Sequence, residues 1–341
     1  MYMITGEPLQ GKTMEQLQLF LQSCQLDTDP ALDFTVLLVE EDAIIATGSL
    51  CGNTIRCVAV APTHQGEDLT AQVMTPLMQH AFQQGIKHLL VYTKPHNQHL
   101  FSPFGFYPVI RTADCLLMEN RRGGLDSFLA SLCRPEPTQG PVGSIVMNGN
   151  PFTHGHRYLI ETAAAQCAHV HVFVLSEDKG LFTPNERLRM AQSGCRDLKN
   201  VSVHPTGPYM VSSATFPSYF IKDKLRTGDI HCQLDVRLFG EKIAPALHIT
   251  RRYVGTEPGC PVTRQYNDTL RRLLPACGVE LIEIPRREAL GEVISASRVR
   301  TLIAQKNFSA LAAYLPQTTL DLIDHIKGEF SCRIPSECSE T

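Results

Sequence analysis

The chain has 341 residues, of which 43% are hydrophobic and 19% charged, and it carries a formal net charge of −3 at pH 7. This length accommodates two domains with well-filled cores, and the slightly negative charge excludes a nucleic-acid binder that relies on a broad basic surface. No uninterrupted apolar run approaches the ~20 residues that a membrane helix needs, so no membrane partner is expected. The 12 cysteines are scattered without zinc-type spacing, which favours buried free thiols, no metal site and a cytoplasmic location.

The first part of the chain mixes strand and helix patterns. After a leader and a helix within residues 1–30, strands are predicted at 34–40, 43–49, 57–61, 87–93 and 115–118, with a long helix at 69–84 and a short one at 97–101. This order, ending in a Gly-Phe pair at 105–106, resembles the GNAT acyltransferase fold over residues 30–120. The resemblance implies an α+β domain.

The loop before the long helix departs from the GNAT pattern. In that family a Q/R-x-x-G-x-G/A loop presents backbone amides to the pyrophosphate of coenzyme A, and Gln65 matches its first position. Asp68 and Thr70, however, stand where the family has small residues. A carboxylate repels a pyrophosphate, and a side chain blocks its close approach to the backbone. We therefore expect this domain to be a scaffold or docking surface, with a working acetyltransferase as the alternative.

A domain boundary is predicted in the middle of the chain. The stretch Arg134-Pro135-Glu136-Pro137-Thr138-Gln139-Gly140-Pro141 cannot continue a helix or strand, because its prolines lack the backbone N–H that such elements use. A helix within 121–133 leads into it. We therefore expect a first domain at 1–133, a linker at 134–142 and a second domain at 143–341.

The second domain alternates strands and helices. Strands are predicted at 144–148, 170–175, 201–204, 233–239, 252–254 and 280–284, and helices at 218–225 and 266–274 and from Thr153, Thr183 and Ser295. Such alternation predicts an α/β fold with a Rossmann-like parallel sheet and helices on both faces. Ligands of these sheets bind beyond the carboxyl ends of the strands, where the strand order switches.

The first candidate site lies between the strand at 144–148 and the helix that follows it. Thr153 is a natural helix cap, so unpaired backbone N–H groups and the positive end of the helix dipole would face an anion. His156 falls at the third helical position and can add an imidazole, while Gly155 leaves room for a ligand. An isolated T-x-G-H is more often only a cap, but the strand-to-helix context favours a phosphate site.

A second half-site begins with Ser295, the natural cap of another helix. Ser297 and Arg300 are three residues apart and share one helix face. Arg298 lies about 200° from Arg300 around the helix, so only one of the two arginines can point where Ser297 points. We predict that Arg300 faces the ligand and that Arg298 faces solvent or a surface carboxylate.

The two motifs together resemble the nucleotidyltransferase superfamily, which uses T/H-x-G-H and I-S-x-S-x-x-R to attach a nucleotide to a small acceptor. The resemblance covers residues 142–330. Combined with the acyltransferase-like first half, the chain resembles the citrate lyase ligase family, for example at Asn150-Pro151-Phe152-Thr153 and Arg252-Tyr253-Val254-Gly255. That resemblance implies ATP-dependent acetylation, through acetyl-AMP, of the thiol prosthetic group on the acyl-carrier subunit of citrate lyase. Acetate and this carrier would be the partners, and ATP with Mg²⁺ the cofactors.

The chemistry assigns roles to the first motif. His156 would donate to oxygens of the α- or β-phosphate, Thr153 would add a hydroxyl, and the amides near Gly155, in the loop that starts at Asn150, would bind the triphosphate.

The other candidate residues lie farther along the chain. Ser295, Ser297 and Arg300 would hold the β- and γ-phosphates from the opposite side. Lys179 is a further candidate cation or a solvated lysine, and Glu257 either supports the nucleotide pocket or caps the next helix. No group for the thiol-transfer step can be named.

Two other functions stay open at this point. One is a nucleotidyltransferase that makes a stable cofactor product, which leaves the acyltransferase-like half unexplained. The other is a non-catalytic adaptor that docks a carrier protein, against which the intact pair of motifs argues.

Overall fold

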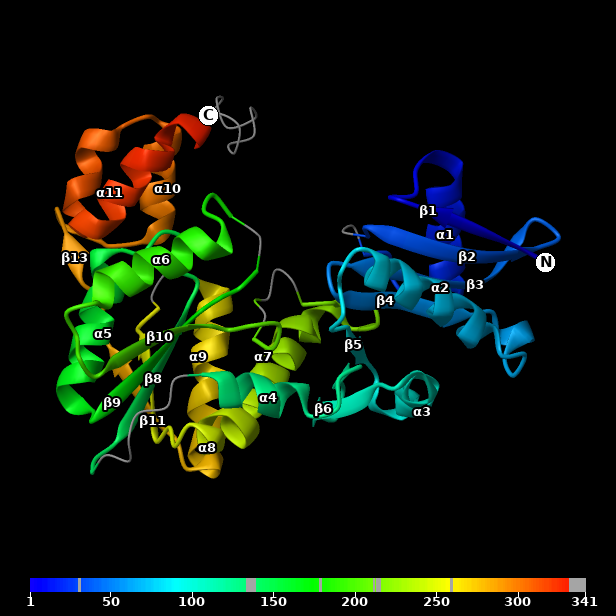
Figure 1. The fold of residues 1–341 in the computed structure, drawn as a ribbon, viewed down its shortest axis with the longest axis horizontal. Coiled ribbons are helices and arrows are strands. Elements are labelled where there is room, and N and C mark those ends of the chain that lie inside the picture. Colours follow the sequence, from blue (N-terminus) through cyan, green and yellow to red (C-terminus); the bar gives the residue numbers. More distant parts are fainter. Residues whose placement is uncertain are drawn as a thin grey trace. The chain divides into compact units, whose positions relative to one another are not determined.

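The computed structural model describes residues 1–29, 32–132, 139–177, 180–210, 212, 216–257 and 260–330. The chain forms two compact units (Figure 1). The first comprises Met1–Ser127 and Phe216–Leu234, and the second comprises the described parts of Phe128–Thr215 and Asp235–Thr341. Most of the linker expected at 134–142 lies outside the described residues.

The first unit is built on a mixed sheet of seven strands in the order β1-β2-β3-β4-β5-β7-β6. Only the β4–β5 pair is parallel, and its register covers two residue pairs, Thr54 with Leu90 and Ile55 with Val91. The α+β architecture agrees with the GNAT-like expectation. Its elements are β1 Tyr2–Gly6, α1 Gly11–Ser23, β2 Phe34–Glu40, β3 Ala43–Cys51, β4 Thr54–Val60, α2 Leu69–Gln83, β5 Leu90–Thr93, α3 Gln98–Phe101, β6 Tyr107–Arg111, β7 Leu116–Glu119 and the start of α4 Gly124–Ser131.

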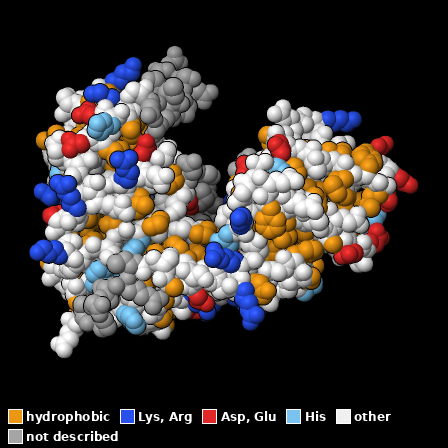
Figure 2. Space-filling model, viewed as in Figure 1, with side chains coloured by type: hydrophobic (Ala, Val, Ile, Leu, Met, Phe, Trp, Pro, Cys, Tyr) orange, Lys and Arg blue, Asp and Glu red, His pale blue; other side chains and the backbone are white. Residues whose placement is uncertain are grey.

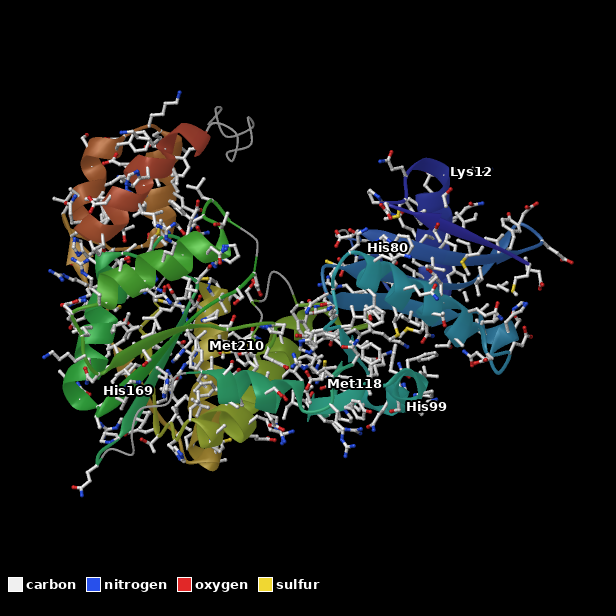
Figure 3. All side chains as sticks on the ribbon, viewed as in Figure 1. Lys12, His80, His99, Met118, His169 and Met210 are labelled. Atoms are coloured by element: carbon white, nitrogen blue, oxygen red, sulfur yellow. The ribbon has the colours of Figure 1, made fainter. Side chains whose placement is uncertain are left out.

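The core of the first unit forms between the sheet and α2. Val73, Leu77 and Ala81 recur at four-residue spacing on one helix face and are fully buried. His80 of α2, labelled in Figure 3, stacks on Phe34 of β2 with 3.8 Å between the ring centroids. The amphipathic spacing of α2 therefore explains how the helix packs on this sheet, whose strands β2 and β3 are buried along most of their length.

Phe216–Leu234 is an insertion that the expected two-part division did not contain. Phe216, Tyr219 and Phe220 are buried in the first unit. The Tyr219 hydroxyl donates to the Tyr92 carbonyl of β5 at 3.3 Å, beyond the two residues of β5 that pair with β4. The Tyr219 carbonyl in turn accepts from the backbone N–H of Asp27 at 2.8 Å. The segment therefore satisfies a backbone group that the short β4–β5 ladder leaves unpaired.

The second unit contains a five-stranded sheet in the order β10-β9-β8-β11-β12, and every pairing in it is parallel. This confirms the expected Rossmann-like sheet. The chain moves outward from β8 to β9 and β10 and then returns to β11, so the order switches between β8 and β11. Its elements are β8 Val142–Met147, α5 His154–Gln166, β9 His169–Val174, α6 Pro184–Cys195, β10 Val201–Pro205, α7 Thr227–Leu238 (whose first part belongs to the first unit), α8 Ala244–Ala246, β11 Arg251–Gly255, α9 Pro261–Leu273, β12 Glu280–Ile284, β13 Glu288–Ala289, β14 Glu292–Val293, α10 Ala296–Ala304 and α11 Gln317–Ile326.

One face of this sheet packs on α5 and α6, which lie together in Figure 1. Ile145 and Met147 of β8 contribute to this core, together with Ile160 of α5 and Met190 of α6. Side chains alternate along a strand, so Ser144 and Val146 point to the opposite face. One face of β8 therefore packs in the core with α5 and α6, and the other face carries Ser144 and Val146.

Two secondary-structure expectations were wrong. The helix predicted at 218–225 is a turn segment that ends in a short 3₁₀ stretch, and the strand predicted at 233–239 is helical. The alternation of Leu234, Val236 and Leu238 imitates a strand, but all three side chains are nearly inaccessible to solvent within a helix. A helix buried on more than one side loses the single apolar stripe that identifies it in a sequence.

Three further observations concern the described residues. None of their helices is long and apolar enough to cross a membrane. They hold no group of three or more His, Cys, Asp and Glu side chains that could bind a metal ion, and their cysteines are free thiols. Figure 2 shows both acidic and basic side chains on each unit, on the face drawn there.

Gly194 of α6 provides a test of the packing around the candidate site. A Cβ at this position would lie 2.5 Å from Cε1 of Phe152, whose ring is fully buried. Gly194→Ala should therefore lower the free energy of unfolding by ~1–3 kcal/mol, although alanine is the better helix former. Urea denaturation followed by circular dichroism measures the change. Gly328→Ala, where a Cβ meets nothing within 4 Å, is the control and should stay within ~0.5 kcal/mol of the unsubstituted protein. Equal stability of the two variants would contradict the packing argument.

Candidate active site

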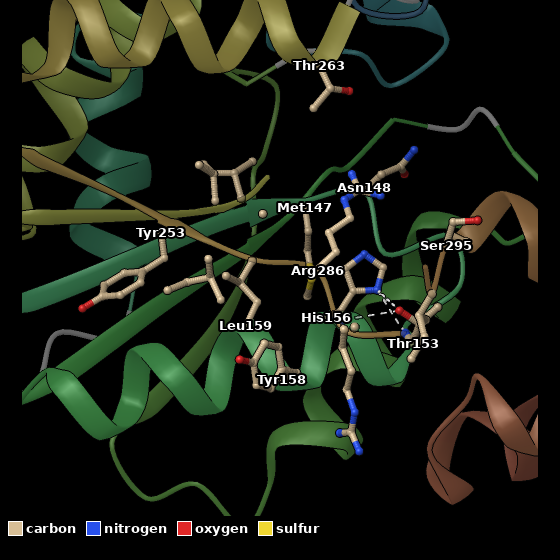
Figure 4. A pocket seen from close by; sticks show the side chains of 18 of the residues that line it. Met147, Asn148, Thr153, His156, Tyr158, Leu159, Tyr253, Thr263, Arg286 and Ser295 are labelled. Atoms are coloured by element: carbon tan, nitrogen blue, oxygen red, sulfur yellow. Dashed lines mark hydrogen bonds between the residues drawn. The ribbon is translucent and has the colours of Figure 1, made fainter. Parts of the chain in front are cut away.

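A pocket of about 350 Å³ lies at the carboxyl ends of β8 and β11, where the strand order switches (Figure 4). Figure 4 shows His156, Thr153 and Ser295 close together on one wall and Thr263 of α9 on another. This is the place that the parallel-sheet pattern predicts for a ligand.

Thr153 and His156 form a reciprocal capping box at the start of α5. The Thr153 hydroxyl accepts from the backbone N–H of His156 at 3.3 Å, and the backbone N–H of Thr153 donates to Nδ1 of His156 at 3.0 Å. The histidine thus occupies the position that Glu or Gln takes in the usual motif. Because Nδ1 accepts a hydrogen bond from the backbone, the neutral ring carries its proton on Nε2.

The imidazole of His156 stays neutral. Burial lowers its pKa to about 4, and the nearby Arg286 guanidinium contributes in the same direction. Phe152 stacks beside the ring at 5.8 Å between centroids. His156 therefore offers a fixed hydrogen-bond donor, Nε2–H, rather than a positive charge.

The second motif lies against the first. Nη1 of Arg300 donates to the carbonyl oxygen of Asn150 at 2.7 Å, which joins residues 150 positions apart in the sequence. Nη2 donates to the hydroxyl of Ser297 at 3.1 Å, so the predicted shared face of Ser297 and Arg300 exists. Burial of the guanidinium lowers the pKa of Arg300. The structure thus brings the two segments together, as the sequence argument required.

The contributions of α10 to the pocket differ along the helix. Ser295 caps the helix by accepting from the backbone N–H of Arg298 at 3.1 Å, and it lines the pocket with Ala296. Ser297 and Arg300 are not among the described residues that line it. Arg298 points outward and pairs with Glu292 at 3.6 Å, as the helical-face argument predicted.

Asn150 shapes the loop rather than pointing at a ligand. Its side chain is 5% exposed, and Oδ1 accepts from the backbone N–H of Phe182 at 3.2 Å. Gly155, in the first turn of α5, lines the pocket, and a Cβ there would meet Thr153 and Ile294 at 3.5 and 3.6 Å. The contact to Ile294 is a further meeting point of the two motifs.

The predictions for Glu257 and Lys179 have different outcomes. Glu257 accepts from the backbone N–H of Cys260, the residue that precedes α9, at 3.1 Å and also pairs with Arg286. It therefore serves the start of the next helix and holds a guanidinium of the pocket wall at the same time. Lys179 lies outside the described residues.

Arg286 of the pocket wall and Arg187, which supports Asn148 of that wall, were not predicted as site residues. Arg286 follows β12, lines the pocket and donates through Nε to the Thr256 carbonyl at 2.8 Å. Arg187 of α6 is 1% exposed and donates to both oxygens of Asn148, at 3.1 Å to its carbonyl. The sequence could have indicated Arg286, because it lies just beyond the carboxyl end of a predicted strand. Nothing in the sequence marks an arginine within a helix, such as Arg187, as part of a site.

The assembled groups suit an anionic ligand. The backbone N–H groups of His154 and His156 already donate to the Tyr314 carbonyl and the Thr153 hydroxyl, so the first turn of α5 offers the backbone of Gly155 to the pocket. His156 supplies a neutral donor, and Arg286 supplies a positive charge. Donors held in fixed positions stabilise charge that develops on phosphate oxygens without needing to reorganise.

Comparison with known proteins agrees with this geometry. The family model described as citrate lyase ligase C-terminal domain matches residues 142–323, and the acetyltransferase (GNAT) family model matches residues 5–106. A citrate (pro-3S)-lyase ligase of Klebsiella pneumoniae is 40% identical over 91% of this chain and 92% of its own length. Its counterpart from Haemophilus influenzae is 40% identical over 92% of this chain and 95% of that protein.

A third relative, the citrate (pro-3S)-lyase ligase of Escherichia coli, is 36% identical over 95% of both chains. One family model thus matches more than half of the chain, and three relatives match nearly its whole length. The chain belongs to the citrate lyase ligase family, enzymes of the ligase class, as its two motifs predicted.

Proposed function

We propose that this protein uses ATP to acetylate the thiol prosthetic group on the acyl-carrier subunit of citrate lyase. Acetate and ATP would first give acetyl-AMP and pyrophosphate, and transfer of the acetyl group to the carrier thiol would then release AMP. The observation that carries the proposal is the contact between the two motifs, in which Arg300 donates to the loop that leads into Thr153 and His156. The family relationship supports the acceptor.

Acetate is a poor acyl donor until its carboxylate is activated. In the first step a carboxylate oxygen forms a bond to the α-phosphorus, the bond from that phosphorus to the bridging oxygen breaks, and its electron pair leaves with pyrophosphate. Such a displacement needs alignment of the reactants and stabilisation of charge on the equatorial oxygens. Fixed donors in a partly buried pocket meet both needs.

The residues divide this work. Nε2–H of His156 would donate to an oxygen of the α-phosphate, and the backbone N–H of Gly155 would bind the adjoining phosphate. The Thr153 hydroxyl lies 2.9 Å from Nδ1 of His156, and it would turn from this nitrogen to a phosphate oxygen when ATP binds. Ser295, Ser297 and Arg300 would bind the β- and γ-phosphates from α10, whose start lies beside Gly155. Mg²⁺ would be held largely by phosphate oxygens and water, its usual environment beside a nucleotide. A reducing cytoplasm suits an acceptor that must present a free thiol.

The decisive experiment follows pyrophosphate release from ATP and Mg²⁺. We expect release only when acetate is added, because the carboxylate is the nucleophile. Release that requires a phosphopantetheine compound or a mononucleotide instead of acetate would favour a nucleotidyltransferase with a stable product. No release under any of these conditions would favour an adaptor.

His156→Ala should lower kcat for acetate-dependent pyrophosphate release by ~100–1,000-fold, because a donor to the transition state is lost. Steady-state kinetics measures this, with circular dichroism to verify the fold. His154→Ala is the matched control, since His154 is not among the described residues that line the pocket, and it should keep kcat within about threefold. Wild-type turnover of the His156 variant would remove the imidazole from the mechanism.

Arg300→Ala should raise the KM for ATP at least ~10-fold, because the guanidinium both holds the loop at Asn150 and would bind a phosphate. Arg298→Ala removes only a surface ion pair and should change this KM less than ~2-fold. The two variants are compared under saturating acetate. Equal effects would refute the separation of the two helix faces.

A further inference from the structure

Arg252 of β11 is a buried arginine that the roles above do not use. It pairs in register with Ser144 of β8, on the sheet face opposite Ile145 and Met147. The side chain is 2% exposed, and Nη1 donates to the Ser144 hydroxyl at 3.2 Å. Phe239 covers one side of the guanidinium, whose central carbon lies 4.6 Å from the ring centroid.

The guanidinium of Arg252 lacks a carboxylate partner among the described residues. Among the described residues no acidic side chain forms an ion pair with Arg252, and its buried Nε has no hydrogen-bond partner. Tyr266 and then Asp235 favour the charged guanidinium electrostatically, and the Asp235 carboxylate itself accepts from the Tyr266 hydroxyl at 2.5 Å. Burial lowers the pKa of Arg252. A buried, incompletely bonded cation is unfavourable unless an anion joins it.

Arg252 is one of the residues that line the pocket, together with His156 and Thr153. It lies three residues before the end of β11 at Gly255, and its partner Ser144 lies three residues before the end of β8 at Met147. Arg252 therefore sits deeper in the sheet than the loop and helix ends that offer donors to phosphates. Val146 and Val254 supply apolar wall beside it.

We propose that Arg252 binds the carboxylate of the acid substrate, so that acetate lies deeper in the pocket than the nucleotide phosphates. This inference rests on the proposed function. A small carboxylate matches the deeply placed guanidinium of Arg252 and the apolar wall beside it, whereas a polyphosphate has the His156 and Arg286 side chains nearer the pocket mouth. One carboxylate oxygen pairs with Arg252, and the other forms the bond to the α-phosphorus as the electron pair of the bridging bond leaves with pyrophosphate. No proton moves, and Arg252 keeps its charge throughout.

The test measures KM for acetate and KM for ATP separately in acetate-dependent pyrophosphate release by the full chain. Arg252→Met should raise the KM for acetate at least ~10-fold while the KM for ATP changes less than ~2-fold. Arg252→Lys keeps the charge but loses the planar fork, and it should raise the KM for acetate several-fold. If Arg252→Met does not fold, Arg252→Lys by itself tests the prediction.

Arg251→Met is the matched control. Arg251 is the neighbouring residue on the same strand, but it lies on the other face and pairs with Glu280 at 2.9 Å. Its KM for acetate should stay within ~2-fold of the wild-type value.

The possible outcomes separate this inference from the proposed function. An unchanged KM for acetate in both Arg252 variants overturns the inference and leaves the function intact. A joint rise of both KM values would mean that Arg252 binds the nucleotide, and it also overturns the inference. Absence of acetate-dependent pyrophosphate release from the unsubstituted protein overturns the proposed function, and the acid site with it.

Discussion

The reciprocal capping box between Thr153 and His156 is the interaction on which the site depends. It starts α5 directly after the loop that follows β8, and it ties Nδ1 of the imidazole to a backbone N–H at 3.0 Å. One pair of contacts thereby sets the direction of the helix N-terminus, the tautomer of the histidine and the donor that faces the pocket. The neutral state follows from burial, since the pKa of about 4 keeps the ring unprotonated near neutral pH.

Three arginines around the loop show how a buried charge can serve different purposes. Arg187 and Arg300 donate to backbone carbonyls of the 148–150 loop, so their charge stabilises the local chain. Arg252 is as deeply buried as Arg187, but within the described part of the chain it donates only to a serine hydroxyl. Charges that complete the fold find acceptors within it, whereas a charge left short of acceptors beside a pocket indicates a ligand.

The first unit has the GNAT-like order of elements but an altered loop and an added segment. Asp68, directly before α2, has a left-handed backbone with φ of 56°, and its side chain does not cap the helix. Tyr219 donates to a carbonyl of β5 beyond the short β4–β5 ladder. The scaffold role that the loop sequence predicts for this unit is still a proposal.

The sequence alone determined the elements that depend on local pattern. The parallel α/β sheet, the caps at Thr153 and Ser295 and the opposite faces of Arg298 and Arg300 all follow from spacing of 2.0 and 3.6 residues and from cap chemistry. The tertiary structure decided what depends on distant neighbours: the assignment of Phe216–Leu234 to the first unit, the helical state of the alternating stretch at 233–239, and the burial of Arg187 and Arg252. The burial of a residue and its contacts depend on segments that lie far away in the sequence. The local spacing of apolar residues therefore does not reveal them.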